Sequence, residues 1–343
     1  MRVGFTYDLR DDYLARGFSP EEAAEFDTIE TVEGIEGALS FLGLSVDRIG
    51  NIESLTRRLA GGGTSDRWDF VFNIAEGLHG FAREAQIPAL LDAYRIPYTF
   101  SDPLALSLCL HKAMTKRIVR DLGLSTPKFA VFSSPDDPLP DDLTFPLFAK
   151  PVAEGTGKGI SAASKIESKA ELMCTIEAIL SRYRQPVLVE EYLPGREFTV
   201  GIVGTGGKAR STGIMEIHFG EAAESDVYSF TNKKEYEKRV YYTVPKDQLA
   251  SKAITLALAV WKGLGLRDGG RIDVREDREG NPSFIEVNPL AGLNPVDSDL
   301  PILSRINGMS YQRLIYEIVE SASERIESLS HFLLQKSIRK ETL

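Results

Sequence analysis

The residues best suited to metal chemistry lie near the C-terminal end of the chain, on either side of the polar turn 277–282. Apolar and polar residues alternate in the two segments that flank this turn, which predicts a β-hairpin. Side chains on a strand alternate between its two faces. One face would then carry Arg271, Asp273, Arg275, Phe284, Glu286 and Asn288. The opposite face would pack on the core through Ile272, Val274, Ile285 and Val287.

Three oxygen-bearing side chains of this hairpin are candidate metal ligands, namely Asp273, Glu286 and Asn288. Carboxylate and amide oxygens suit a hard cation such as Mg²⁺, which usually completes its shell with phosphates. The alternative is a solvated face whose acids pair with Arg271 and Arg275. The metal interpretation is favoured because an Arg-x-Asp, a Glu-x-Asn and a glycine-rich exit occur together on one predicted face.

A second candidate site is the glycine-rich stretch 154–159, which follows Lys150 at the end of a predicted strand. Glycines let backbone N–H groups approach phosphate oxygens, and Thr156 adds a hydroxyl. The stretch is not a P-loop, because Gly-Lys-Ser/Thr at a strand-to-helix junction is absent. Upstream, Lys112 and Lys116 lie one helical turn apart and would share a helix face. Their spacing alone favours a solvated basic face.

Together these segments resemble the D-alanine–D-alanine ligase family of ATP-grasp ligases. The resemblance rests on the hairpin, on Lys-Pro and the glycine-rich stretch at 150–159, and on Glu-Glu-x-x-x-Gly-x-Glu at 190–197. It covers most of the chain, up to about Ala322. It implies an α/β ATP-grasp fold with an N-terminal doubly wound α/β domain. The implied reaction is amide formation between amino acids through an acyl phosphate made from ATP.

The resemblance also implies roles for individual residues, with ATP and Mg²⁺ bound, two ions expected and Mn²⁺ as an alternative. Residues implied to bind the nucleotide are Lys112, Lys150, Thr156, Gly157, Glu190, Glu191, Leu193, Glu197 and Lys233, with Lys234 as an alternative to Lys233. Within this group Glu190 would face the adenine amino group and Glu197 the ribose. Implied catalytic residues are Arg271, Gly292 and His79, and implied metal ligands are Asp273, Glu286 and Asn288. Taken alone, a His such as His79 is more often a hydrogen-bonding structural residue.

The residues that would face the amino acids depart from the family pattern. Where the family continues with Gly-Glu-Asp-Gly, this chain reads Phe-Ala-Arg-Glu-Ala-Gln at 81–86. The family's Ser-x-Glu-His-Glu-Val-Ser falls near 25–30, without the Ser and His. We therefore expect a preferred pair other than two D-alanines, with Arg83 available for an additional carboxylate. Two functions are alternatives to a D-alanine–D-alanine ligase-like activity. One is a ligase of another amino-acid or peptide substrate, and the other is an ATP-binding regulator without catalysis. A dehydrogenase is disfavoured, because 6–10 has no glycine.

Bulk properties favour a globular enzyme of the cytoplasm. The chain has 343 residues, a net charge of −10, and 43% hydrophobic and 26% charged residues. The negative charge disfavours a nucleic-acid partner. Cys109 and Cys174 form no metal or disulfide pattern, as is usual in a reducing compartment. No apolar segment approaches membrane-spanning length, and the first residues read as a strand rather than a signal peptide.

The elements that must position these groups begin with an alternation of strands and helices. Strands are predicted at 2–7, 44–49, 69–74 and 97–100, and an amphipathic helix at 28–42. This rhythm predicts a mostly parallel, doubly wound sheet. We expect four parts, namely an N-terminal domain 1–104, a central subdomain 105–190, a C-terminal subdomain 191–325 and a helical tail 326–343. The tail would pack on the body or on a second copy in a homodimer.

Overall fold

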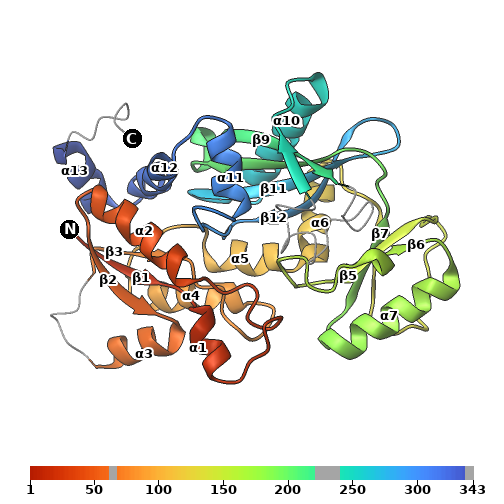
Figure 1. Cartoon of the computed structure of the whole chain (residues 1–343), viewed down its shortest axis with the longest axis horizontal. Helices are drawn as coiled ribbons and strands as arrows, with labels where there is room; N and C mark the ends of the chain where they lie inside the picture. The colour runs from red at the N-terminus through yellow and green to blue at the C-terminus, as the bar shows by residue number, and fades with distance from the viewer. Residues whose placement is uncertain (62–67, 221–239, 337–343) are drawn as a thin grey trace.

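The structure, a computed structural model, describes residues 1–61, 68–220 and 240–336. Its strands form three separate sheets with helices packed against each, as Figure 1 shows. The mixture of one parallel and two antiparallel sheets with helical layers confirms the α/β class. No helix in the described part of the chain is long and apolar enough to cross a bilayer.

The first sheet is parallel, in the order β2-β1-β3. Its strands are β1 (Arg2–Thr6), β2 (Ser45–Gly50) and β3 (Phe70–Asn73). The predicted fourth strand at 97–100 is wrong, because the chain makes only one isolated bridge there, between Val71 and Tyr98. The extended path ends at Phe100, whose φ of 71° turns the backbone away from the sheet.

Helices cover both faces of this sheet, as the doubly wound prediction requires. On one face α2 (Ile29–Phe41) packs its apolar stripe against Val3 and Phe5. On the other face α3 (Ile52–Ala60) and α4 (Gln86–Ala93) enclose a core around Val71. A short helix, α1 (Arg10–Ala15), lies in the connection between β1 and α2. The loops at the carboxyl ends of these strands therefore gather at one edge, where open α/β sheets place ligands.

The central sheet is antiparallel, in the order β4-β7-β5-β6, and α7 (Lys169–Tyr183) covers one face. Its strands are β4 (Phe129–Phe132), β5 (Leu147–Pro151), β6 (Lys165–Ile166) and β7 (Val187–Glu191). It is reached through α5 (Pro103–Leu110) and α6 (Lys112–Asp121). The glycine-rich stretch is the connection between β5 and β6.

The third sheet is antiparallel, in the order β10-β9-β8-β11-β12. Its strands are β8 (Glu197–Val203), β9 (Arg210–Phe219), β10 (Val240–Thr243), β11 (Gly269–Glu276) and β12 (Pro282–Asn288). One face packs on α10 (Gln248–Gly263), the helix that the amphipathic pattern predicts. The other face packs on α11 (Asp299–Ile306) through Met215, Ile302 and Leu303.

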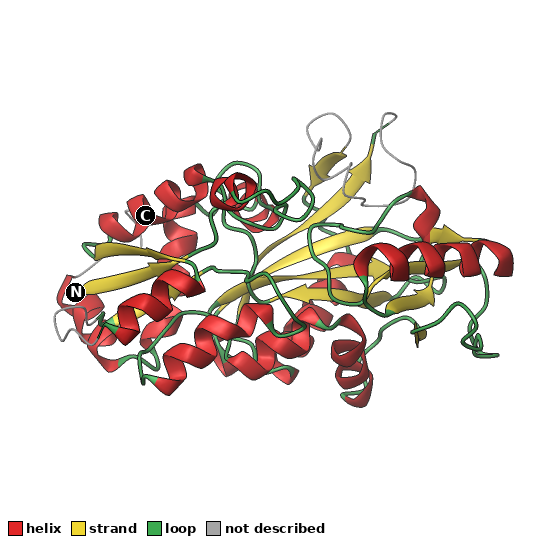
Figure 2. Ribbon diagram, turned by 90° about the horizontal axis from the view of Figure 1, so that it is seen from below, coloured by secondary structure: helices red, strands yellow, loops and turns green. Residues whose placement is uncertain are grey.

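The C-terminal helices return to the first sheet. Helix α12 (Tyr311–Ser323) packs against α2, and α13 (Glu327–Lys336) packs against α12. Figure 1 shows α13 at the same end of the molecule as the N-terminus, and Figure 2 shows helices on both sides of the strands at that end. Leu329 is buried, and Phe332 and Leu333 pack on the same core, so the described part of the tail lies on the body of its own chain. The rest of the predicted tail, 337–343, lies outside the described residues.

Candidate active site between the central and C-terminal sheets

The predicted hairpin forms from β11 and β12 and brings the expected polar groups together. Arg271 pairs with Asn288, and Asp273 pairs with Glu286. Strand β11 is held on its other side by β8, so the hairpin is an integral part of the sheet. The polar face is therefore supported by a continuous ladder of backbone hydrogen bonds.

The predicted facing of two residues on β12 is wrong. Phe284 was expected on the polar face, but it is fully buried in the core. Ile285 was expected in the core, but it lines the pocket on the polar side. The reason is a β-bulge, because the register shifts between Asp273 and Val274 and leaves Ile285 without a pairing partner. A bulge inserts one extra residue and so breaks simple alternation.

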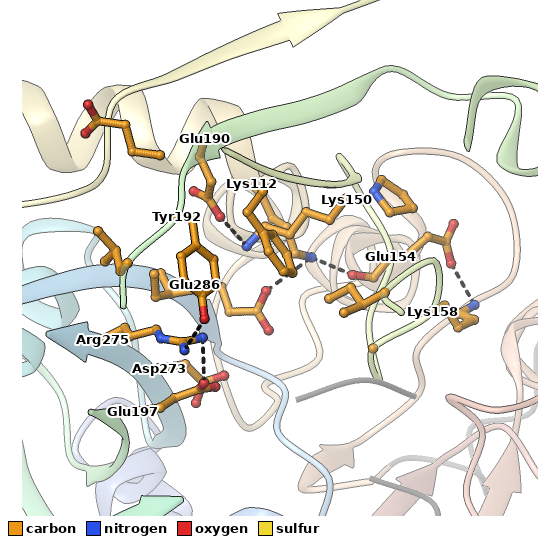
Figure 3. A pocket seen from close by; sticks show the side chains of 17 residues that line it. Lys112, Lys150, Glu154, Lys158, Glu190, Tyr192, Glu197, Asp273, Arg275 and Glu286 are labelled. Carbon is orange, nitrogen blue, oxygen red and sulfur yellow. Dashed lines mark hydrogen bonds and ion pairs between the residues drawn. The ribbon is translucent and has the colours of Figure 1, made fainter. Parts of the chain in front are cut away.

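A pocket of about 780 Å³ opens between the central sheet and this hairpin (Figure 3). Nine of the residues predicted from the sequence line it, namely Lys112, Lys150, Gly157, Glu190, Glu191, Leu193, Glu197, Asp273 and Glu286. The segment 190–197 runs from the end of β7 to the start of β8 and so joins the two sheets. Gly195 is required at this junction, because a Cβ there would lie 2.6 Å from Glu276 Cβ.

One buried carboxylate holds two lysines at the back of this pocket. Glu190 lies 2.7 Å from Lys116 Nζ and 2.8 Å from Lys150 Nζ. Burial opposes the charge on Lys150, but Glu190 and Glu286 outweigh it, so the pKa of Lys150 is raised. Burial lowers the pKa of Lys116 to about 8 despite Glu190. Lys150 is thus fixed as a cation facing the pocket, a suitable partner for phosphate.

The glycine-rich stretch closes one side of the pocket. Lys112 lies 3.6 Å from Glu286, and its Nζ donates to the Glu154 carbonyl at 2.5 Å. Gly157 lines this pocket, whereas Thr156, exposed and with a φ of 55°, lines a neighbouring cleft. Gly157 and Thr156, which were predicted to act at one site, therefore line two different spaces.

The neighbouring cleft is larger, with about 2340 Å³ of open space. It lies between the loops of the first sheet and the hairpin, and it shares Lys112, Glu154 and Glu286 with the first pocket. Arg271, Asn288 and Gly292 also line it. Groups predicted to act on phosphate and groups predicted to act on the acyl carbon therefore face connected spaces.

The candidate metal ligands are the carboxylates of Asp273 and Glu286 and the amide of Asn288. Asp273 accepts from Arg271 at 2.7 and 2.5 Å and from Thr199 Oγ1 at 2.9 Å. Asn288 has a buried side-chain nitrogen with no partner among the described residues. A half-turn of the side-chain amide exchanges the positions of its nitrogen and oxygen. Asn288 can therefore present an oxygen at this unpartnered position on the hairpin face. The set fits a hard cation.

Arg271 is held between two acids. Its guanidinium bonds Asp273 and lies 3.6 Å from Asp299. Burial opposes its charge, but Asp273, Asp299 and Glu286 together raise its pKa. Arg271 therefore stays charged at the floor of the larger cleft.

The structure does not bring His79 into this group. His79 is exposed, and within the described part of the chain it lines neither the pocket nor the cleft. Its carbonyl accepts from Gln86 Nε2 at 3.0 Å, which is a structural contact. Lys233 and its alternative Lys234 lie outside the described residues.

The expectation that Arg83 is available for a substrate carboxylate is wrong. Arg83 is buried and lies 2.9 Å from Glu25, and it also donates to the Ala153 carbonyl at 2.9 Å. Glu25 in turn accepts from the Gly155 N–H at 2.6 Å and lies 3.4 Å from Lys158. Both groups are therefore used to hold the glycine-rich stretch.

Two residues that line the pocket, Arg275 and Tyr192, were not predicted to belong to the site. Arg275 lies 3.2 Å from Glu197 and donates to the Tyr192 hydroxyl at 3.2 Å. Its place two residues after Asp273 on the same strand face was a usable signal. Lys116 was predicted to share a helix face with Lys112, but its contact with Glu190 was not predicted. Tyr192 gave no such signal, because aromatic residues in loops are common.

Comparisons with known proteins agree with this geometry. Residues 118–320 match the family model described as D-ala D-ala ligase C-terminus. A D-alanine–D-alanine ligase of Bordetella petrii is 30% identical over 300 residues, covering 86% of this chain and 87% of that protein. One from Aquifex aeolicus is 33% identical over 244 residues, covering 71% and 79%.

Solved structures show the same fold. A D-alanine–D-alanine ligase of Bacillus anthracis complexed with ATP superposes with a TM-score of 0.71 at 22% identity, covering 96% of this chain and 99% of that one. The VanG D-Ala:D-Ser ligase of Enterococcus faecalis gives 0.70 at 18% identity, covering 94% and 99%. The chain belongs to the D-alanine–D-alanine ligase family and has its ATP-grasp fold.

Proposed function

We propose that this protein is an ATP-dependent ligase that joins the carboxylate of one amino acid or short peptide to the amine of another. The observation that carries the proposal is the junction between the two spaces. Lys112 and Glu286 line both the pocket beside Lys150 and the cleft that contains Arg271 and Gly292. A phosphate at this junction would reach a carboxylate in the cleft.

In the proposed reaction, a carboxylate oxygen attacks the γ-phosphorus of ATP, and the bond to the β-phosphate oxygen breaks to release ADP. An amine nitrogen then attacks the acyl carbon and loses a proton, and inorganic phosphate leaves. Lys150 and Lys112 would bind and orient the phosphates as charged donors. Arg271 and the Gly292 N–H would stabilise the oxyanion that forms at the acyl carbon.

Asp273, Glu286 and Asn288 would hold Mg²⁺, as two ions or with Mn²⁺ in its place. When bound, the metal supplies charge neutralisation at the β- and γ-phosphates. Glu190 would direct an oxygen toward the adenine amino group, and Glu197 would accept from the ribose hydroxyls. Glu191 and Leu193 would contact the adenine through their backbone, and Thr156 and Gly157 would cover the phosphates.

The glycine-rich stretch would exclude water from the acyl phosphate. His79, exposed outside both spaces, would act only if its loop moved toward the cleft. We also propose the division into 1–104, 105–190, 191–325 and 326–343, which the three separate sheets support. A cytoplasmic enzyme is consistent with these substrates.

The test is a screen for ADP release with Mg²⁺, ATP and D- and L-amino acids, singly and in pairs. We expect ADP release that depends on both the amino acid and Mg²⁺. An ATP-binding regulator would bind nucleotide but release no ADP with any substrate. That outcome would contradict the ligase proposal.

A further inference from the structure

The larger cleft is strongly acidic. Its basic lining residues are three, namely Arg10, Lys112 and Arg271. Its acidic lining residues are nine, namely Glu21, Glu25, Asp27, Glu76, Glu84, Glu154, Glu286, Asp297 and Asp299. This imbalance matters only if the acids lack partners within the protein.

Five of the nine acids do have cationic partners. Glu21 pairs with Arg182, and Glu25 pairs with Arg83 and Lys158. The remaining three pairs are Glu154 with Lys158, Glu286 with Lys112, and Asp299 with Arg271. These pairs account for two of the three basic lining residues, Lys112 and Arg271.

The other four acids have no hydrogen bond or ion pair to another side chain in the described part of the chain. One of them, Asp297, is exposed, and the other three are at least partly buried. They are Asp27, Glu76 and Glu84, and they come from the two loops at the carboxyl edge of the first sheet. Glu84 retains only 8% of its exposed area and faces the cleft. A buried polar side chain normally has a partner, so an unpartnered carboxylate facing a cleft points to a ligand.

The neighbouring cations do not balance these three groups. Arg83, the closest candidate for Glu76 and Glu84, is already used by Glu25 and the Ala153 carbonyl. Arg10 forms no ion pair with a described residue. Its charge acts to lower the pKa of both Asp27 and Asp297. The cleft therefore presents three carboxyl groups without a cationic partner to whatever enters it.

The protonation behaviour of the three acids agrees with this description. Burial, with repulsion from Asp8, raises the pKa of Asp27 to about 8. Burial raises the pKa of Glu84 to about 7 even though Arg83 opposes the shift. Burial, with repulsion from Glu84, also raises the pKa of Glu76. A bound cation would lower these pKa values, because it would stabilise the ionised forms.

An organic cation fits better than a metal ion. No three His, Cys, Asp or Glu side chains among the described residues lie close enough together to hold a metal. Spread carboxylates suit an ammonium or guanidinium group on a flexible chain, which can reach several acceptors. Two neutral amino acids would bring no net charge to the cleft, since each ammonium accompanies a carboxylate.

We infer that one of the two substrates carries a cationic group besides its α-amino group, an ammonium or guanidinium that binds between Asp27, Glu76 and Glu84. This inference rests on the proposed ligase function and names the substrate class of that same site. It reverses the sign of the charge expected from the sequence, where Arg83 was to receive an additional carboxylate.

The test compares basic amino acids with neutral ones of the same chain length. Lysine is paired with norleucine and ornithine with norvaline, each as the D- and L-form, alone and with a second amino acid, in the ADP-release assay. We expect kcat/KM for the basic member to exceed that of its neutral partner by about 100-fold or more, because unpaired polar groups discriminate strongly. Equal turnover, or a preference for the neutral member, would overturn the inference.

Calorimetric binding of the same amino acids, with a non-hydrolysable ATP analogue present, separates this inference from the ligase proposal. If no amino acid releases ADP but lysine or ornithine binds more tightly than its neutral partner, the ligase proposal fails and the cation site stands. If ADP is released but neither assay shows a preference for the basic member, the ligase proposal stands and the cation site is rejected.

Two isosteric variants locate the site. Asp27→Asn and Glu76→Gln should each reduce the preference for the basic amino acid by about 10-fold or more while leaving the KM for ATP unchanged. Glu33→Gln, an exposed acid on α2 outside the cleft, makes the same charge change and should have no effect. An unchanged preference in both cleft variants would overturn the assignment. If a variant fails to fold, the substrate comparison on the unaltered protein decides.

Discussion

Glu25 and Arg83 form a buried ion pair at 2.9 Å that connects two loops of the first sheet with the glycine-rich stretch of the central sheet. Both side chains contact that stretch, Glu25 at the Gly155 N–H and Arg83 at the Ala153 carbonyl. The first sheet therefore takes part in positioning the loop that borders the nucleotide pocket. Closing of this loop and filling of the amino-acid cleft should be coupled through the pair.

Removal of Arg83 should destabilise the protein more than removal of the whole pair. Arg83→Met leaves Glu25 buried with fewer partners, and breaking a buried pair costs about 3–5 kcal/mol. Glu25→Gln with Arg83→Met leaves no uncompensated charge, so its unfolding temperature should fall by less than the sum of the single changes. Thermal unfolding followed by circular dichroism measures all three variants. Strictly additive shifts would contradict the coupling.

Much of the fold and site could be predicted because the signals were local. The alternation along β11 identified Asp273 and its neighbours, and the pattern at 248–263 identified α10. The facing of Phe284 and Ile285 could not be predicted, because a bulge depends on pairing with another strand. The pairing of Arg83 with Glu25 could not be predicted either, because 58 residues separate them in sequence.

Loss of either hairpin carboxylate should abolish turnover without unfolding the chain. Asp273→Asn and Glu286→Gln each remove a candidate metal ligand but no core methylene. We expect ADP release to fall by more than about 100-fold, as for removal of a group that stabilises transition-state charge. Glu279→Gln, in the exposed turn of the same hairpin, is the control. Near-normal rates at low Mg²⁺ in both ligand variants would reject the metal site.

Lys150 should contribute most of its effect through ATP binding. Lys150→Ala removes a buried cation facing the pocket, and the affinity for ATP should fall by about 1.5–3 kcal/mol, the range for a charge-assisted hydrogen bond. Titration calorimetry measures the loss, and Lys128→Ala, an exposed lysine outside the pocket, is the control. Unchanged affinity in Lys150→Ala would contradict the phosphate role.

ATP should also protect the glycine-rich stretch from proteolysis. The stretch 155–159 connects two strands and borders the pocket, so bound phosphates should hold its backbone N–H groups in place. Limited proteolysis with and without the non-hydrolysable analogue, read by mass spectrometry, measures protection at these residues. Cleavage at the same rate in both conditions would count against a loop that closes on nucleotide.

The stability of the protein without substrate should fall as pH rises through neutrality, and Asp27 should be one cause. Burial raises the pKa of Asp27 to about 8, whereas an unfolded aspartate titrates near 4. Between these values the folded state holds a proton that the unfolded state has lost. Unfolding free energy therefore decreases with pH across this window, by at most about 1.4 kcal/mol per pH unit for this group.

Asp27→Asn removes this titration, so its unfolding temperature should fall less steeply than that of the unaltered protein between about pH 5 and 8. Thermal unfolding measured across this range, with Glu33→Gln as the exposed control, tests the difference. A bound basic amino acid should flatten the profile of the unaltered protein too, because it stabilises the ionised carboxylate. Parallel profiles for Asp27→Asn and the unaltered protein would show that the Asp27 carboxylate titrates alike in the folded and unfolded states.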